Sequence, residues 1–117
     1  MSNDNPTIFG MILRGEIPSR RVWDDDQCIA FADINPAAPT HVLVIPRKHI
    51  PTLADATDDD RMLLGHMLLV VNQIARDLGV AADGYRVVIN VGDGGGQTVF
   101  HLHMHLLAGR PLHWPPG

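Results

Sequence analysis

The sequence is short of cysteine, of aromatic residues and of positive charge. Its single cysteine, Cys28, has no partner for an internal disulfide, which suits a reducing compartment such as the cytoplasm. The 13 acidic residues outnumber the 9 basic ones, which disfavours a surface that binds nucleic acid through bulk positive charge. No apolar run approaches the roughly 20 residues of a membrane-spanning helix, and the polar N-terminus lacks the apolar segment of a signal peptide. We therefore expect a cytoplasmic protein that binds neither membranes nor nucleic acid.

The chain does contain enough apolar residues for one core. Of its 117 residues, 45% are hydrophobic, and this length is typical of a single domain. We expect one domain over residues 1–117, with residues 1–6 disordered and residues 109–117 forming a C-terminal tail. The acidic net charge is compatible with a single nucleotide held by hydrogen bonds and dipoles.

Hydrophobic periodicity predicts an α+β fold. A long helix is expected over residues 58–78, capped by Thr57 and followed by Gly79, and a short one over residues 7–14. His66, inside the long helix, is interpreted as a packing or surface residue, and the acidic triplet 24–26 as a solvated turn rather than a cation site. The strands expected from alternating or β-branched runs are residues 21–23, 27–32, 41–46, 85–91 and 101–107. Because helices and strands lie in separate blocks, we expect an antiparallel sheet of about five strands.

Residues 101–107, His-Leu-His-Met-His-Leu-Leu, are the most informative stretch. Alternation with a period of two is typical of a strand, which would place three imidazoles on one face and apolar side chains on the other. Besides a chance cluster, two functions fit this row. Three histidines and a water can form an open catalytic zinc site, and one imidazole can be a nucleophile that its neighbours orient. The spacing alone does not separate the two.

Polar and glycine residues that suit a phosphate precede the histidines. Glycines 94–96 allow backbone N–H groups to approach an anion, although a plain turn would have the same composition. Gln97 and Thr98 follow with two hydrogen-bonding side chains. Asn90 is either a turn residue or a donor to a ligand, and Asp33 either caps a loop or accepts the hydroxyls of a ribose.

The motif of residues 101–107 resembles the histidine triad pattern, His-φ-His-φ-His-φ-φ with φ apolar, and the chain resembles the histidine triad (HIT) family, most of all its Hint branch of purine nucleoside phosphoramidases. The likeness covers nearly the whole chain. The segments that carry it include 8–9, 17–18, 33–34, 38–41, 43–46, 65–66, 84–86, 95–97 and the tail His-Trp-Pro-Pro-Gly at 113–117.

The resemblance implies hydrolysis without a metal or other cofactor. His103 would attack the α-phosphorus of an AMP or GMP phosphoramidate, of the AMP-amine or AMP-lysine type, and water would release the nucleotide from the histidine. A backbone carbonyl could hold the second nitrogen of His103, with His41 and His101 in the same network. His105 would protonate the departing amine or bind a phosphoryl oxygen.

The resemblance also implies the binding residues and a homodimer. The nucleotide would contact, besides the histidines, Ile8, Phe9, Ile12, Phe31, Asp33, Ile34, Asn90, Gly96, Gln97, Thr98 and Trp114. Asp33 would bind the ribose hydroxyls and the apolar residues would enclose the purine, although an ordinary core would use the same apolar residues. Hint-like dimers join edge to edge with the long helix in the interface, and the C-terminal tail with Trp114 reaches the partner's active site.

Other functions stay open at this stage. A related HIT hydrolase would split dinucleoside polyphosphates or acyl adenylates. A nucleotide-binding adaptor would act by holding a partner protein, and a three-histidine metal hydrolase would need carboxylates behind its ligands. His105 stands where the uridylyltransferase branch carries Gln, which disfavours transfer to a sugar phosphate. Adenine and guanine fit an apolar slot equally well.

Overall fold

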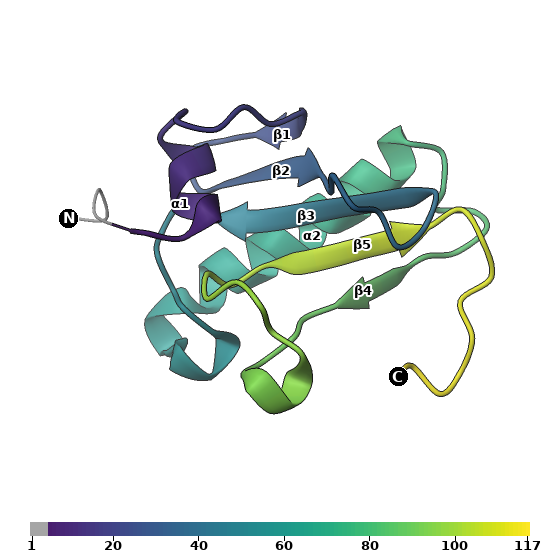
Figure 1. Cartoon of the computed structure of the whole chain (residues 1–117). Helices are drawn as coiled ribbons and strands as arrows, with labels where there is room; N and C mark the ends of the chain where they lie inside the picture. Colours follow the sequence, from purple (N-terminus) through teal and green to yellow (C-terminus); the bar gives the residue numbers. More distant parts are fainter. Residues whose placement is uncertain (1–4) are drawn as a thin grey trace.

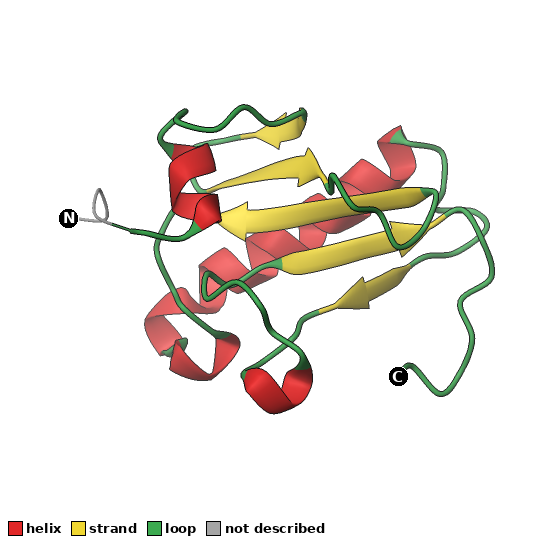
Figure 2. Ribbon diagram, in the orientation of Figure 1, coloured by secondary structure: helices red, strands yellow, loops and turns green. Residues whose placement is uncertain are grey.

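The computed structural model describes residues 5–117, so the expected disorder of residues 1–4 lies outside the described residues. Five strands form one antiparallel sheet in the order β1-β2-β3-β5-β4. They are β1 (Arg21–Asp24), β2 (Cys28–Ala32), β3 (Thr40–Pro46), β4 (Arg86–Val88) and β5 (Met104–Ala108). The α+β fold with five antiparallel strands and one long helix is therefore confirmed (Figures 1 and 2). Within residues 5–117, no helix is long and apolar enough to cross a membrane.

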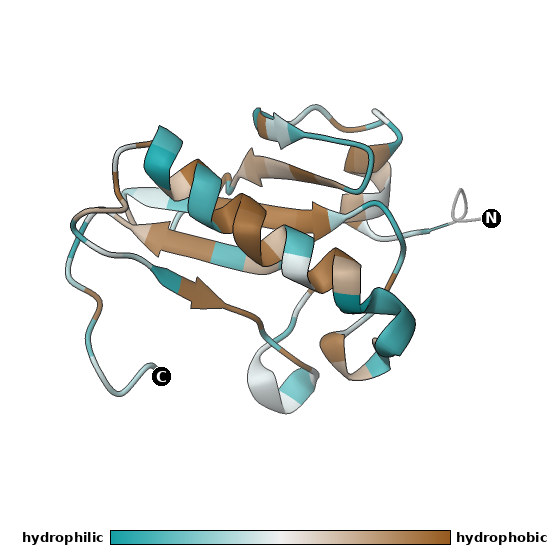
Figure 3. Cartoon of the chain, turned by 180° about the vertical axis from the view of Figure 1, so that it is seen from behind, coloured by the Kyte–Doolittle hydropathy of each residue, from teal (hydrophilic) through white to brown (hydrophobic). Residues whose placement is uncertain are grey.

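The long helix α2 (Arg61–Asp77) covers one face of the sheet (Figure 3). Its apolar side packs on Val42, Val44, Met104 and Leu106, which point to that face from the central strands. The helix follows a single 3₁₀ turn (Asp58–Asp60), so regular α-helix begins three residues later than predicted. A capping box explains this start: Thr57 accepts from Asp59 N, and the Asp60 carboxylate accepts from Thr57 N.

The short helix α1 (Ile8–Leu13) lies on the opposite face, across β2 and β3 (Figure 1). Thr7 caps it, because its hydroxyl accepts a hydrogen bond from Gly10 N at 3.1 Å. Phe9 and Ile12 pack against Phe31 and Leu43 from the sheet. Asn5, just before the helix, is buried and hydrogen-bonded, so the structure differs there from the expected disorder of residues 1–6.

Two predicted strands are shorter than expected. β5 begins at Met104, so the prediction of a strand from residue 101 is wrong for the first two histidines. The reason is a change of partner: pairing with β3 stops at Val44↔Met104, and Leu102 N donates instead to Ile50 O at 2.7 Å. β4 covers Arg86–Val88 rather than residues 85–91. Beyond it the chain turns, and Asn90 Nδ2 donates to Gly95 O at 2.7 Å.

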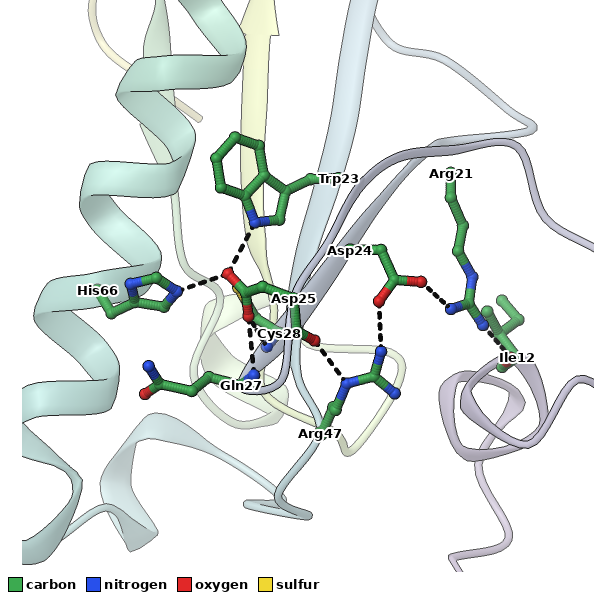
Figure 4. Close-up of polar contacts among 9 residues, drawn as sticks. All are labelled: Ile12, Arg21, Trp23, Asp24, Asp25, Gln27, Cys28, Arg47 and His66. Carbon is green, nitrogen blue, oxygen red and sulfur yellow. Dashed lines mark hydrogen bonds and ion pairs between the residues drawn. The ribbon is translucent and has the colours of Figure 1, made fainter.

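The acidic turn between β1 and β2 joins the sheet to α2 through Asp25 (Figure 4). Asp25 Oδ1 accepts from the backbone N–H groups of Gln27 and Cys28, and Oδ2 accepts from Trp23 Nε1 at 2.8 Å and His66 Nε2 at 2.7 Å. The interpretation of 24–26 as a solvated turn is therefore wrong for Asp25. His66 is a hydrogen-bond partner of that carboxylate rather than a mere packing residue, because the turn folds back against the helix.

Candidate active site

Four imidazoles gather on the face of the sheet that carries α1. His41 lies on β3 and His105 on β5, and the pairing Leu43↔His105 places the two histidines on neighbouring strands. His101 and His103 lie in the extended segment before β5. His101 is 0% exposed, His103 6% and His41 9%. His105 is half-buried. The hydrogen-bond partners of these four rings decide which nitrogen of each carries the proton.

His101 has a protein partner at each ring nitrogen. Nε2 lies 2.8 Å from the carbonyl oxygen of Pro46, which can only accept, so Nε2 donates. Nδ1 lies 2.9 Å from the side-chain Nδ2 of Asn5 and accepts its N–H. His101 is thus a neutral ring with both nitrogens in use, and it has no lone pair left for a ligand.

In His103, by contrast, a protein partner is present at only one of the two ring nitrogens. Its Nδ1 lies 2.8 Å from the carbonyl oxygen of His101 and therefore donates to it. The neutral ring then carries its lone pair on Nε2, which has no hydrogen-bond partner within residues 5–117. The ring of Phe9 packs edge to face against it, with centroids 5.0 Å apart. His103 therefore offers a fixed, unprotonated nitrogen, as a nucleophile must.

His41 and His105 form a hydrogen-bonded pair. Nδ1 of His41 accepts from the backbone N–H of Ala37 at 3.0 Å, so its Nε2 carries the proton and donates to Nδ1 of His105 at 2.9 Å. His105 in turn carries its proton on Nε2. The Asp33 carboxylate lies 3.4 Å from His41 Nε2. The pair therefore presents an N–H donor beside the lone pair of His103, whose ring centroid is 5.0 Å from that of His105.

Burial keeps these rings neutral. Desolvation lowers the pKa of His101 and that of His105 to about 4, with a further contribution from neighbouring histidines. Desolvation also lowers the pKa of His103, against the opposing effect of its hydrogen bond to His101 O, and the pKa of His41, against the attraction of Asp33. At neutral pH the site is a set of uncharged imidazoles with defined tautomers.

The hydrogen bonds disfavour a metal site made of the three triad histidines. Both nitrogens of His101 are bonded to protein atoms, and Nδ1 of His103 donates to a carbonyl. A second set, Asp33, His41 and His105, has ligand atoms within 4.8 Å of one another, but the hydrogen bonds from Ala37 and within the pair would have to break.

The third set that could hold a metal, Asp25, Cys28 and His66, lies away from the triad and is also bonded internally. Burial, together with the charge of Asp25, raises the pKa of the Cys28 thiol to about 12, so the thiol keeps its proton.

An apolar pocket of about 320 Å³ opens next to the histidines. It brings together all the residues that were predicted to enclose the purine and ribose, and these are Ile8, Phe9, Ile12, Phe31, Asp33 and Ile34. Phe31 and Phe9 form its packed wall, and Ile34 is 89% exposed. Asp33 both lines this pocket and faces His41, so it lies between the apolar slot and the imidazoles.

The remaining predicted binding residues do not line this pocket. Gln97 is buried, and its amide accepts from Gly92 N and donates to Pro51 O and Val99 O, so this side chain holds the glycine loop. Gly96 adopts φ of +80°, which the tight turn after the 3₁₀ helix (Asp93–Gly95) requires. Asn90 donates a hydrogen bond to Gly95 O in the same loop. Thr98 is exposed, and Trp114 is 82% exposed in the tail.

Sequence reasoning missed two residues of the site, Asn5 and His49. Asn5 is 96 positions from its partner His101. The ring of His49 stacks on that of His101 with centroids 5.2 Å apart. An asparagine in a polar N-terminal stretch and a histidine in a basic turn carry no periodic signal, so only the fold reveals these contacts.

Comparison with known proteins shows which families and structures this chain is similar to. A family model described as the HIT domain matches residues 14–112. An uncharacterized HIT-like protein of Synechocystis sp. is 57% identical over 111 residues, which cover 95% of this chain and 96% of that protein. An uncharacterized HIT-like protein of Synechococcus elongatus is 56% identical over the full length of both chains. The crystal structure of a HIT family hydrolase from Legionella pneumophila superposes with a TM-score of 0.92 at 50% identity, covering 94% of this chain and 98% of that one.

Proposed function

This chain belongs to the HIT family and has the fold of its hydrolases, and we propose that it hydrolyses purine nucleoside phosphoramidates, without a metal, as a cytoplasmic homodimer. The observation that carries the proposal is the pairing of a free lone pair on His103 Nε2 with an N–H donor on His105 Nε2. A nucleophile and a proton donor in fixed tautomers, next to an apolar pocket, suit attack on phosphorus and expulsion of an amine.

In the first step, Nε2 of His103 bonds to the α-phosphorus and the phosphorus–nitrogen bond to the amine breaks. The amine leaves with the proton from Nε2 of His105, and a proton from water replaces it, so His105 returns to its neutral Nε2–H form. The nucleotidylated His103 ring carries one positive charge. His41 keeps His105 oriented for this transfer, because its Nε2–H points at His105 Nδ1.

In the second step, water attacks the phosphorus and the bond to His103 breaks. The hydroxyl of the water joins the nucleoside monophosphate, and its proton passes to the solvent, which replaces the proton taken up in the first step. The carbonyl oxygen of His101 holds Nδ1–H of His103 through both steps, so the same nitrogen faces the phosphorus throughout. The reaction adds one water and regenerates the starting protonation state.

The position of Asp33 supports a nucleoside substrate. A nucleotide has its ribose between its base and its phosphate. With the base in the apolar pocket and the phosphate at the imidazoles, the ribose would lie at Asp33, which is located between them. One carboxylate oxygen already accepts from Asn35 N at 2.9 Å, so the other is the one suited to a ribose hydroxyl. The slot is lined mostly by apolar side chains, with Arg20 and Asp33 as its charged lining residues, and it suits the flat ring of adenine or guanine.

Exposed apolar residues support the homodimer. Met62 and Leu69 of α2 are 83% and 67% exposed, although the opposite side of the helix is buried on the sheet. In the part of the chain that the structure describes, β4 pairs with β5 on one side only and forms an edge of the sheet. A second copy joined at this edge would cover both features and bring its tail, with Trp114, toward the site.

The test is AMP release from an AMP phosphoramidate, measured with and without EDTA on the wild type and on His103→Ala. Release that is insensitive to EDTA and absent in the variant is the expected result. Loss of activity with EDTA that added metal restores would refute the metal-free mechanism. No release by the wild type would refute the substrate class, and dinucleoside polyphosphates and acyl adenylates would be tested next.

A further inference from the structure

Asn5 connects the N-terminal segment to the first histidine of the triad. It is 4% exposed, and each end of its side-chain amide has a defined partner. Oδ1 accepts from the backbone N–H of Thr7 at 3.1 Å and from its hydroxyl at 2.9 Å. Since those two donors fix the oxygen, the NH₂ group faces His101 and donates to its Nδ1 at 2.9 Å.

The backbone around Asn5 is also held in place. Its carbonyl oxygen accepts from Arg14 Nη1 at 2.7 Å. Gly10 makes room for the side chain, because a Cβ at that position would approach Asn5 Cγ to 2.6 Å. The side-chain amide of Asn5, which donates to His101, is therefore held in one position between α1 and the sheet.

Any proton added to His101 would have to enter at Nδ1, where the amide of Asn5 already points its own N–H. The other ring nitrogen donates to Pro46 O. The titratable neighbours are His49, stacked on the ring, and His103, and Arg14 reaches the backbone of Asn5. No carboxylate within residues 5–117 pairs with His101, so its surroundings oppose a positive charge.

We propose that Asn5 is a positioning residue, whose amide keeps His101 neutral in its Nε2–H form and so keeps positive charge away from the nucleophile His103. A cation at residue 101 would withdraw electron density from the lone pair that attacks phosphorus. His101 also supplies the carbonyl that holds Nδ1 of His103, so Asn5 supports the ring on which that carbonyl sits. This role rests on the proposed function.

The sharpest test is Asn5→Asp, which preserves the shape of the side chain. One carboxylate oxygen still accepts from Thr7, but the other replaces the NH₂ group and faces Nδ1 of His101 as an acceptor. His101 is then expected to bind a second proton. We expect kcat for AMP phosphoramidate at pH 6 to fall about tenfold and to recover as the pH rises and His101 loses that proton.

Two readouts separate this role from a purely structural one. NMR of the histidine ring signals should show His101 titrating at higher pH in Asn5→Asp than in the wild type, and the pH profile of kcat should shift in the same direction. Gln27→Glu is the matched control, since it adds the same charge at an exposed turn and should change neither readout. An unchanged His101 titration, or a shifted titration with an unchanged kcat profile, would overturn the proposal.

Gly10→Ala provides a second variant that does not depend on the folding of Asn5→Asp. The added methyl displaces the asparagine without altering its chemistry, and we expect a smaller upward shift of the His101 titration. A His101 titration identical to that of the wild type in this variant would also count against the role of Asn5. If the wild type releases no AMP, the proposed function fails, and the NMR titrations still decide whether Asn5 controls the protonation of His101.

Discussion

Two polar clusters beside the core, one around Asp25 and one made by the histidines, differ in which donors and acceptors they leave without a hydrogen bond. In the Asp25 cluster, both carboxylate oxygens accept hydrogen bonds, and His66 and Trp23 donate theirs to the same group. In the histidine cluster, Nε2 of His103 keeps a free lone pair and Nε2 of His105 a free proton. A saturated cluster stabilises a fold, whereas a cluster with one unused acceptor and one unused donor can do chemistry.

The two clusters also differ in charge: Asp25 is ionised, whereas the buried histidines are neutral. Partial burial opposes ionisation of Asp25, but the hydrogen bonds from Trp23, the backbone and His66 outweigh it and lower the pKa of the carboxyl well below its usual range. At His101 and His105 the stabilising interactions are weaker than desolvation, so the pKa values of these two rings fall. Asp25 is therefore an anion and the histidines are neutral rings, because the hydrogen bonds to the carboxylate outweigh its partial burial whereas desolvation dominates at the rings.

The largest effect that would distinguish the clusters is on turnover. His103→Ala should lower kcat/KM for AMP phosphoramidate by at least about 10³-fold, because it removes the attacking nitrogen. Asp25→Asn should leave kcat/KM of the folded protein within about twofold, because that cluster lies outside the reaction. Steady-state AMP release by both variants measures this, and equal losses would mean that the comparison is wrong.

The free energy of unfolding should depend more on the Asp25 cluster than on His103. Asp25→Ala leaves the indole N–H of Trp23, the ring of His66 and two backbone N–H groups without their acceptor, and should lower the free energy of unfolding by about 3 kcal/mol. His103→Ala leaves one backbone carbonyl unpaired and should have a smaller effect. Urea denaturation followed by circular dichroism measures both values. A larger loss in His103→Ala would contradict the assignment of the structural role to Asp25.

The pH dependence of stability should separate the clusters next. His101 and His105 have folded pKa values near 4, below the ordinary 6.5, so the unfolded chain binds more protons between these values. The free energy of unfolding should therefore fall as the pH drops from 6.5 to 4. The lowered pKa of Asp25 adds a further loss at pH values below about 4, where the unfolded carboxyl is protonated. Asp25→Asn should remove only this second part, as urea denaturation at a series of pH values would show.

The smallest effect should come from a single donor of the saturated cluster. Trp23→Phe keeps the ring but removes the indole N–H that donates to Asp25 Oδ2, so the free energy of unfolding should fall by about 1 kcal/mol. His66 and the backbone still hold the carboxylate. A loss as large as that of Asp25→Ala in the same denaturation assay would mean that the donors do not share the role.

The sequence by itself determined the secondary structure that follows from local pattern. Alternation and helical spacing are properties of neighbouring residues, so the two helices, five strands and the apolar face of the histidine stretch were predictable. The likeness of residues 101–107 to the family motif also pointed to the histidines. The match of the family model to residues 14–112 supports that family assignment.

Only the tertiary structure decided which nitrogen of each ring carries a proton, because the partners come from distant segments. Asn5 and Pro46 fix His101, Ala37 fixes His41, and His66 reaches back to Asp25 from α2. The early end of the β3–β5 ladder, which takes His101 and His103 out of the strand, likewise depends on the loop at Ile50. Hydrogen bonds between residues far apart in sequence leave no periodic trace, although they set the chemistry of the imidazoles that the motif supplies.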